Sequence, residues 1–367
     1  MSGIQFVLLF TLFLPMVVLT SFIPYFTRHT ESFGITVSEE VFHSSDLRRM
    51  RKQYAASNFV IQAILSVVAI AMTIRSSDSA NVSAMWISMY VMISIVTQFL
   101  TMIYFHKKMK KYKAEHLADM TMPQVKLTID MNFRKQKLII SKKWYLIHAL
   151  LIIATFMFTL VNYDLFPDKI IMQYDFAGNP TTVSDKTIGT VFMPVVMQIV
   201  MTLLFMFINT VIYRSKQQVD TEHPEVSLEK NRIFRLRNSI FNLFASLMLI
   251  LLFCFIQFQM LYSVDPVILA TVSISFVVLI LAGTGILYVT TGQGGSRVKS
   301  SVGPSSKPPR DDDQNWKLGM FYFNPSDPSL FVEKRMGYGW TINHARPLAW
   351  MIFGGIIGSI VLVSILL

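Results

Sequence analysis

Eight long apolar runs, separated by shorter polar stretches, dominate the pattern of this chain. Each run has about the 17–25 residues that an α-helix needs to cross the hydrocarbon core of a bilayer. The runs lie near residues 4–26, 55–74, 84–105, 144–163, 188–213, 240–262, 267–290 and 348–367. The pattern therefore predicts an all-α integral membrane protein, built as a bundle of about eight transmembrane helices.

The polar stretch before the last run has a different pattern. In residues 316–347, aromatic and apolar residues alternate with polar ones on both sides of the turn-rich residues 324–328, NPSDP. Strand-like runs around such a centre predict a small β-hairpin. Gly337 and Gly339 add a second flexible point before Trp340. We therefore expect a small β-containing segment between the last two transmembrane helices.

These patterns divide the chain into six parts. They are a three-span region with basic loops (1–143), a span pair with a loop at 164–187 (144–213), a two-span hairpin (214–291), a flexible linker (292–313), the β-containing segment (314–347) and the last helix (348–367). The linker is predicted from its Gly, Ser, Pro and charged residues, which leave almost nothing apolar to bury.

The distribution of positive charge predicts the orientation in the membrane. The chain has 33 Lys and Arg residues, and the loops after the first, third, fifth and seventh runs hold 5, 11, 6 and 8 of them. Loops rich in Lys and Arg stay in the cytoplasm. We therefore expect a multi-pass protein of the cell membrane with both termini outside and residues 314–347 in the cytoplasm.

The composition argues against a soluble protein and against several partners. The chain is 53% hydrophobic with a mean hydropathy of +0.48, and only 15% of its residues are charged, against about 25% in a soluble domain. The net charge of +11 includes a lysine run at residues 107–113, which favours contact with anionic lipid headgroups. We expect no nucleic-acid partner, because the run lacks a basic platform with interleaved aromatic residues.

No catalytic or metal motif emerges from the sequence. The zinc-protease motif, the serine-hydrolase motif, the P-loop and the dinucleotide motif are all absent from the chain. Cys254 is the only cysteine, and the seven histidines are scattered. His223, Glu225 and Glu229 have helical spacing, but Pro224 interrupts it and favours a surface loop. We therefore expect a protein that is not an enzyme and has no cofactor or metal.

The apolar runs hold no Asp, Glu, Lys or Arg, which counts against an ion-coupled transporter. Their amide and imidazole side chains are explained by hydrogen bonds between helices; they are Asn58, Gln62, Gln98, His148, Gln198, Asn209, Gln257 and Gln259. Gly354 and Gly358 form a G-x-x-x-G in the last run, which predicts close helix packing within the bundle or, alternatively, in a homo-oligomer.

The loop at residues 164–187 is the one substantial outer loop. Alternation from Ile170 to Phe176, followed by a turn at residues 177–180, predicts a short hairpin or a flap over the bundle. Its candidate binding residues are Pro167, Asp168, Tyr174, Gly178 and Pro180. An ordered connector without a ligand is the alternative.

Two stretches resemble known bacterial families. Residues 166–170, FPDKI, with Tyr174, Gly178, Pro180, Lys186 and Pro194, resemble the DUF1648 membrane domain. The segment from Trp316 to Pro347, with its Asn324-Pro325, Asp327-Pro328 and Gly337-x-Gly339-Trp340, resembles the DUF5808 domain that often accompanies it. The chain departs from the first pattern at residues 171–173, IMQ, where Pro-x-His is usual, and at Thr181, where an acid is common.

The resemblance implies a distant relation to the immunity protein family of the sporulation-delay toxin. It implies a sensor or immunity protein whose outer loop meets an extracellular peptide or envelope component, while the inner segment docks a cytosolic regulator. The candidate docking residues are Trp316, Tyr322, Asn324, Pro325, Asp327, Arg335, Gly337, Trp340 and Asn343. Two alternatives stay open. The segment could simply pack on the bundle with Trp316 and Trp340 at the membrane interface, or the protein could be a permease or channel lined by Gln198, Asn209, Gln257 and Gln259.

Overall fold

The computed structural model describes residues 3–76, 80–117, 136–174, 179–217, 224–299 and 311–366. Its long helices are α1 (Gly3–Ser21), α3 (Ser45–Arg75), α4 (Ala80–His116), α5 (Leu146–Val161), α6 (Ile188–Arg214), α7 (Pro224–Tyr262), α8 (Pro266–Thr291) and α9 (Pro347–Leu366). A one-turn helix, α2 (Glu39–Phe42), precedes α3. Gly178 and residues 300–310 of the predicted linker lie outside the described residues.

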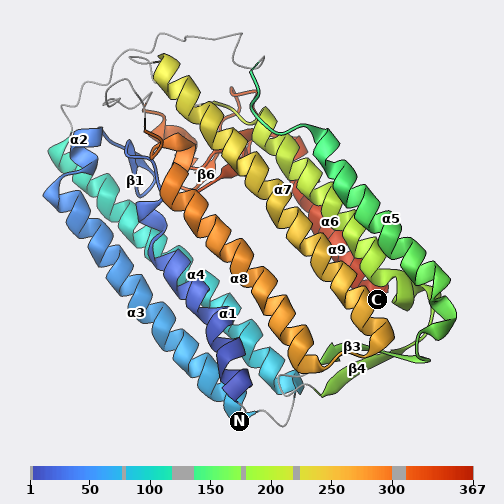
Figure 1. The fold of residues 1–367 in the computed structure, drawn as a ribbon. Helices are drawn as coiled ribbons and strands as arrows, with labels where there is room; N and C mark the ends of the chain where they lie inside the picture. The colour runs from blue at the N-terminus through green and yellow to red at the C-terminus, as the bar shows by residue number, and fades with distance from the viewer. Residues whose placement is uncertain are drawn as a thin grey trace.

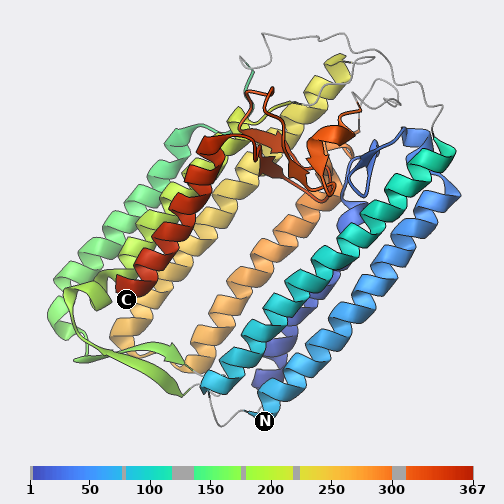
Figure 2. The same ribbon diagram turned by 180° about the vertical axis from the view of Figure 1, so that it is seen from behind.

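The long helices alternate in direction along one common axis (Figures 1 and 2). Six of them are long and apolar enough to cross a membrane, namely α3 to α8, so the protein is embedded in a membrane. The helices α1 and α9, of 19 and 20 residues, complete the alternation. Both chain ends lie at the same end of the bundle (Figure 1).

The two ends of the bundle differ in charge. The four loops rich in Lys and Arg gather at one end, which we call the basic end. The termini and the loop at 162–187 lie at the other, which we call the hairpin end (Figure 2). This separation by charge agrees with the predicted loop pattern, and the side of the membrane that each end faces stays a prediction.

Three helices extend beyond the apolar runs at the basic end. Helix α3 begins ten residues before the predicted span, α4 ends eleven residues after it, and α7 begins sixteen residues before it. Apolar pattern locates the part of a helix in the bilayer, whereas Arg, Lys, Gln and Glu continue a helix into water at little cost. Pro224 starts α7, because proline is tolerated in a first helical turn. The surface loop predicted for Glu225 and Glu229 is therefore wrong.

The helices form two groups joined by α8. Helices α1, α3 and α4 pack together as the first module, and α5, α6 and α7 as the second. Helix α8 packs on α7 and touches α1, and among its described residues only Leu287 and Thr291 are buried. The two modules are therefore held together mainly at the basic end, where the loops converge.

The strands of the described residues form four antiparallel pairs. They are β1 (Glu31–Ser32) with β2 (Ile35–Thr36), β3 (Lys169–Tyr174) with β4 (Pro180–Asp185), β5 (Trp316–Lys317) with β6 (Phe321–Tyr322), and β7 (Phe331–Glu333) with β8 (Trp340–Ile342). The hairpin predicted in the loop 164–187 is confirmed by β3 and β4.

The segment 316–347 contains strands as predicted, but its pairing differs from the single hairpin that the sequence suggests. The strands on the two sides of residues 324–328 do not pair as one hairpin. Instead β5–β6 turns at Leu318 and Gly319, both with positive φ, and β7–β8 turns at Gly337 and Gly339. A bridge between Tyr322 and Asn343 joins the two pairs. Glycines at the outer turns decide the pairing, since they adopt positive φ without strain.

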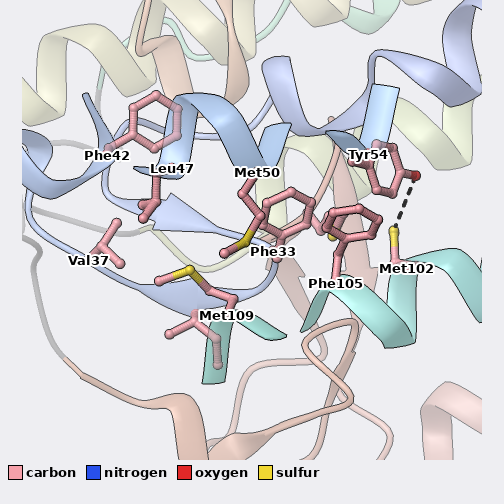
Figure 3. Close-up of a cluster of buried hydrophobic side chains, with 11 residues drawn as sticks. Phe33, Val37, Phe42, Leu47, Met50, Tyr54, Met102, Phe105 and Met109 are labelled. Carbon is pink, nitrogen blue, oxygen red and sulfur yellow. Dashed lines mark hydrogen bonds between the residues drawn. The ribbon is translucent and has the colours of Figure 1, made fainter. Parts of the chain in front are cut away.

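An apolar cluster supports the basic end of the first module. Phe33 from the β1–β2 turn packs against Tyr54 of α3 and Phe105 of α4, with ring centroids 5.7 and 5.4 Å away (Figure 3). Met50 and Met109 fill the space around them. The β1–β2 hairpin is thereby fixed on the extended ends of α3 and α4.

Candidate functional site

Residues 311–346 form the candidate functional site. They lie across the basic end and contact both helical modules (Figures 1 and 2). We call these residues the clamp. Its bonds to the two modules are charged or polar, and they centre on three buried residues: Glu333, Arg335 and Asp327.

Glu333 joins the clamp to both modules at once. It lies on β7 and is 1% exposed. Its carboxylate pairs with Arg28 of the loop after α1, accepts a hydrogen bond of 2.7 Å from Asn231 of α7, and lies 3.8 Å from Arg235 of the same helix. Arg235, also 1% exposed, donates to the Ile212 carbonyl at the end of α6 over 2.6 Å. A buried carboxylate is stable only with partners of this kind.

Arg335 forms the second centre, toward the first module. Its guanidinium pairs with Asp312 and Asp313 and donates to the Gly34 carbonyl in the β1–β2 turn at 3.1 Å. It also lies over the Trp316 ring, 5.3 Å from the centroid. The planar fork of an arginine suits several acceptors at once. Arg335 thus ties the clamp's own acids to the β1–β2 hairpin.

Asp313 extends this centre to α4. It accepts hydrogen bonds from the Thr36 backbone N–H at 3.0 Å and from Lys113 at 2.7 Å. Burial by itself raises the pKa of Asp313, but Arg335 and Lys113 outweigh it and hold the pKa at about 2. The Asp313 carboxylate is therefore ionised at neutral pH.

Asp327 is the third centre and faces the second module. Its carboxylate accepts a hydrogen bond of 2.6 Å from Lys216, which follows α6, and one of 2.7 Å from the Tyr322 hydroxyl. Burial raises its pKa, but these bonds and the Ser329 N–H outweigh it and hold the pKa at about 2. Asn343, with no exposed surface, donates to the carbonyls of Asn324 and Asp327. This amide closes the loop at residues 324–328.

Most of the predicted docking residues lie inside these contacts. Trp316, Tyr322, Asp327, Arg335 and Asn343 are between 0 and 6% exposed. Asn324, Gly337 and Trp340 are half-buried and Pro325 is exposed. Trp340 packs on Phe234 of α7 with centroids 5.0 Å apart. The structure therefore assigns these residues to internal contacts of the clamp.

The exposed surface of the clamp is made of other residues. Leu318, Phe321 and Phe323 are 41, 40 and 44% exposed. Leu318 lies in the β5–β6 turn, whereas Phe321 and Phe323 flank buried Tyr322 and project to the opposite side, as alternation along a strand requires. Phe321 lies 6.3 Å from the Phe99 ring on α4. These apolar side chains suit the membrane interface.

Two glycines allow the clamp to approach the β1–β2 turn. Gly34 has φ +78° and Gly319 has φ +70°. A Cβ on Gly34 would lie 2.4 Å from the Gly319 oxygen, and a Cβ on Gly319 would lie 2.5 Å from Nδ1 of His106. The ring nitrogen of His106 in turn bonds the Phe33 carbonyl at 2.8 Å. The backbones meet here because neither residue has a side chain.

Gly34→Ala is therefore expected to lower the free energy of unfolding by at least about 2 kcal/mol, from left-handed strain plus the clash with Gly319. Thermal unfolding of the purified protein in nanodiscs measures the loss. Gly285→Ala in α8 is the matched control, since its Cβ would meet no atom within 4 Å, and it should be neutral or slightly stabilising. Equal effects of the two substitutions would contradict the close approach.

Glu31 is a buried carboxyl within the same region. It lies in β1, is 5% exposed, and its Oε2 has no hydrogen-bond partner among the described residues. Burial raises its pKa to about 7, although Arg28 and Arg335 lower it and Asp312 and Asp313 raise it further. Because the pKa is higher in the folded protein than the 4.5 of the free group, the folded state holds the proton more tightly.

This shift predicts a pH dependence. The contribution of Glu31 to stability is fully present below about pH 4.5 and is lost as pH rises through about 7. Glu31→Gln removes the titration. The free energy of unfolding of the variant should therefore rise relative to that of the wild type between pH 5 and pH 8, by roughly 3 kcal/mol at most. Unfolding midpoints of both proteins across this range test it. A constant difference between them would count against a raised pKa.

The outer-loop candidates lie on the β3–β4 hairpin and its approach. Pro167, Asp168 and Pro180 are exposed. Tyr174 is instead tied to the bundle, because its hydroxyl accepts a hydrogen bond of 2.9 Å from Gln259 of α7. The hairpin is anchored by Ile170, 1% exposed, which packs with Phe166, Val191 and Met260. Gly178 lies outside the described residues. The hairpin thus offers a free edge and a fixed base.

Polar side chains line the contacts between helices of the second module. Gln198 donates to the Ile250 carbonyl at 3.3 Å, Asn242 to the Tyr145 hydroxyl at 2.9 Å, and Ser239 to Asn209 at 2.5 Å. These bonds agree with the predicted role in helix packing. By contrast, a Cβ on Gly354 or Gly358 would meet no atom within 4 Å, so the described structure shows no helix packed against the G-x-x-x-G of α9.

Sequence reasoning missed the residues that hold the clamp in place. Arg28, Asn231, Arg235 and Glu333 belong to three distant parts of the chain, and no motif links them. Alternation gave no signal for Glu333, because it follows Val332 in β7 and both side chains are buried.

Comparison with protein families confirms the two resemblances. Residues 150–197 match the model of DUF1648, a domain of unknown function, and residues 325–350 match that of DUF5808, a family of unknown function. The first match covers most of α5, the β3–β4 hairpin and the start of α6, and the second covers β7, β8 and the start of α9. Searches of curated proteins and of solved structures found no match.

Proposed function

We propose that this is a non-enzymatic membrane protein of the sensor or immunity type. In this proposal the β3–β4 hairpin meets an extracellular peptide or envelope component, and the clamp at the basic end passes the resulting change to a cytosolic partner. The carrying observation is that two continuous helices, α6 and α7, connect the base of the hairpin to the buried charges of the clamp.

Helix α7 provides the first connection. Gln259 bonds Tyr174 of the hairpin, and Asn231 bonds Glu333 of the clamp. These residues are 28 positions apart on one helix, which is about 42 Å at 1.5 Å per residue. A rigid helix of this length transmits a tilt or shift at one end to the other.

Helix α6 provides the second connection. Val191 in its first turn packs with Ile170 of the hairpin, and its carbonyl accepts from Gln257 of α7. Beyond its last turn, the carbonyl of Ser215 accepts from Arg235, and Lys216 pairs with Asp327 of the clamp. A displacement of α6 and α7 together would strain these bonds and loosen the clamp from the first module.

This use of the clamp differs from binding through its buried residues. The docking candidates Trp316, Tyr322 and Asn343 would become accessible only when the clamp opens, so a partner would bind the open form. The exposed Leu318, Phe321 and Phe323 would then anchor the clamp at the membrane in both forms.

A strain that lacks the gene tests the proposal. Sensitivity to a panel of secreted membrane-active peptides and the transcript profile should both change on deletion and return with the wild-type gene. Gln259→Leu breaks the hairpin contact and should fail to restore the phenotype. Gln62→Leu is the matched control, because Gln62 makes similar buried bonds to Ser94 and Thr97 in the first module. Unchanged sensitivity and transcription after deletion would contradict the proposal.

One observation favours a second candidate, a permease or channel. Gln198 Oε1, Asn209 Nδ2, Gln257 Oε1 and His148 Nδ1 are buried in the second module without a hydrogen-bond partner among the described residues. Such atoms usually bond ordered water, and a row of waters is a path for small polar solutes. Under this reading, Gln198→Leu with Asn209→Leu abolishes a solute flux in proteoliposomes, whereas the sensor proposal predicts no such flux.

A further inference from the structure

A group of metal-binding side chains lies at the basic end, beside the clamp. His29 follows α1, while Glu39 and His43 lie one turn apart at α2. Nδ1 of His29 and Nε2 of His43 are 3.4 and 3.9 Å from Oε1 of Glu39. The ligand atoms of all three residues lie within 4.8 Å of one another. The fold thus brings together two of the histidines that look scattered in the sequence.

The distances suit a shared metal better than direct hydrogen bonds. An N–H···O bond has a donor–acceptor distance of about 2.7–3.2 Å, and both separations exceed it. Ligands at about 2.0–2.1 Å from a tetrahedral zinc ion lie about 3.3 Å from one another. The His29–Glu39 pair already has this spacing, and the exposed His43 side chain lies 3.9 Å from the same carboxylate oxygen.

The chemistry of the group also suits a metal. Imidazole nitrogen and carboxylate oxygen are both ordinary protein ligands of zinc. Two imidazoles and one carboxylate form a set that zinc uses when a fourth position stays open to water or another ligand.

The surroundings hold the three side chains in place. Ser38 caps α2 by accepting from the Val41 N–H at 3.3 Å, which fixes Glu39 in the first turn. The His29 ring lies 5.1 Å from that of Phe42, and Arg51 in turn covers the Phe42 ring from 4.0 Å. The guanidinium of Arg297 donates a hydrogen bond to the Tyr25 carbonyl at 2.8 Å.

We propose that His29, Glu39 and His43 bind one zinc ion at the basic end. The ion would join the loop after α1 to α2. Since His29 follows Arg28, which pairs with buried Glu333, bound zinc would also hold the first module in the position that the clamp requires. The site is independent of the proposed sensor function and would exist in a permease as well.

Zinc titration of the full chain tests this site. The protein is purified in nanodiscs with a tag that contains no histidine, treated with EDTA, and titrated against a chromophoric zinc chelator. We expect one zinc per chain, with affinity lowered at least about tenfold in His43→Ala and in Glu39→Gln. His116→Ala is the control, since that residue is exposed on α4 and stacks on Tyr112, and it should bind zinc as the wild type does.

Cobalt supplies a readout of geometry that a folding defect does not imitate. Co²⁺ added to the apo protein should give the strong visible absorption of a tetrahedral site, and His29→Ala should remove it while the helical circular dichroism stays unchanged. Binding of fewer than one zinc per chain, or equal affinity in the wild type and the His43→Ala and Glu39→Gln variants, would overturn the proposal.

Discussion

Glu333→Ala is expected to lower the free energy of unfolding by about 3–5 kcal/mol, the largest effect of any single substitution in the clamp. The reason is that Arg28 and Arg235 lose the carboxylate that pairs with them, and removal of one member of a buried ion pair is costly. Both arginines approach the same carboxyl group, whose side chain is fully buried. Thermal and denaturant unfolding in nanodiscs measure the change.

Two controls separate charge from shape in this experiment. Glu333→Gln keeps the size and an acceptor for Asn231 but removes the charge. It should therefore be destabilised nearly as much as Glu333→Ala. Glu229→Ala removes an exposed carboxylate that pairs with Arg232 on the same helix, and exposed pairs contribute about 0–1 kcal/mol. A loss in Glu333→Ala no larger than in Glu229→Ala would contradict the role given to the buried carboxylate.

Arg335→Met is expected to have the second largest effect, about 3 kcal/mol. The substitution leaves Asp312 and Asp313 close together without the guanidinium that neutralises them, and it removes the bond to the Gly34 carbonyl. Removal of one member of a buried charged group typically costs this much. Arg335→Lys should recover only part of the loss, since an ammonium group cannot reproduce the planar fork. Lys317→Met, exposed in the same segment, should be nearly neutral.

The same variant has a predicted pH dependence. Because Arg335 and Lys113 lower the pKa of Asp313 from 3.8 to about 2, the pairing stabilises the fold above about pH 4 and is lost as pH falls toward 2. The advantage of the wild type over Arg335→Met should therefore be constant from pH 6 to about 4 and shrink below it. An advantage that grows on acidification would show that Asp313 is not the partner.

Hydrophobic pattern was sufficient to find the helices of this protein. The length of an apolar run is fixed by the bilayer, so α6 and α8 begin and end within two residues of their predicted spans. The hairpin β3–β4 could also be predicted, because its alternation and its turn are local in sequence. The helical extensions of α3, α4 and α7 could not, since their charged residues follow no membrane constraint.

The pairing and contacts of the clamp could not be predicted from the sequence. Its strands are two or three residues long, too short for alternation to specify which strand pairs with which. One of its contacts joins Arg28 to Glu333, about 300 residues away, and in the sequence both look like ordinary charged residues of basic loops. The histidine–glutamate group was missed for the same reason: His29 and His43 become neighbours only because the chain turns back between them through β1 and β2.

Hydrogen–deuterium exchange of the full chain in nanodiscs tests the clamp most directly. If residues 311–346 join the two modules as described, the peptides that cover β5 to β8 and the β1–β2 hairpin should be strongly protected in the wild type. In Glu333→Ala, both sets of peptides should lose protection together, while α5 and the membrane parts of α6 stay protected. Exchange of residues 311–346 at the rate of an unfolded peptide in the wild type would contradict the account.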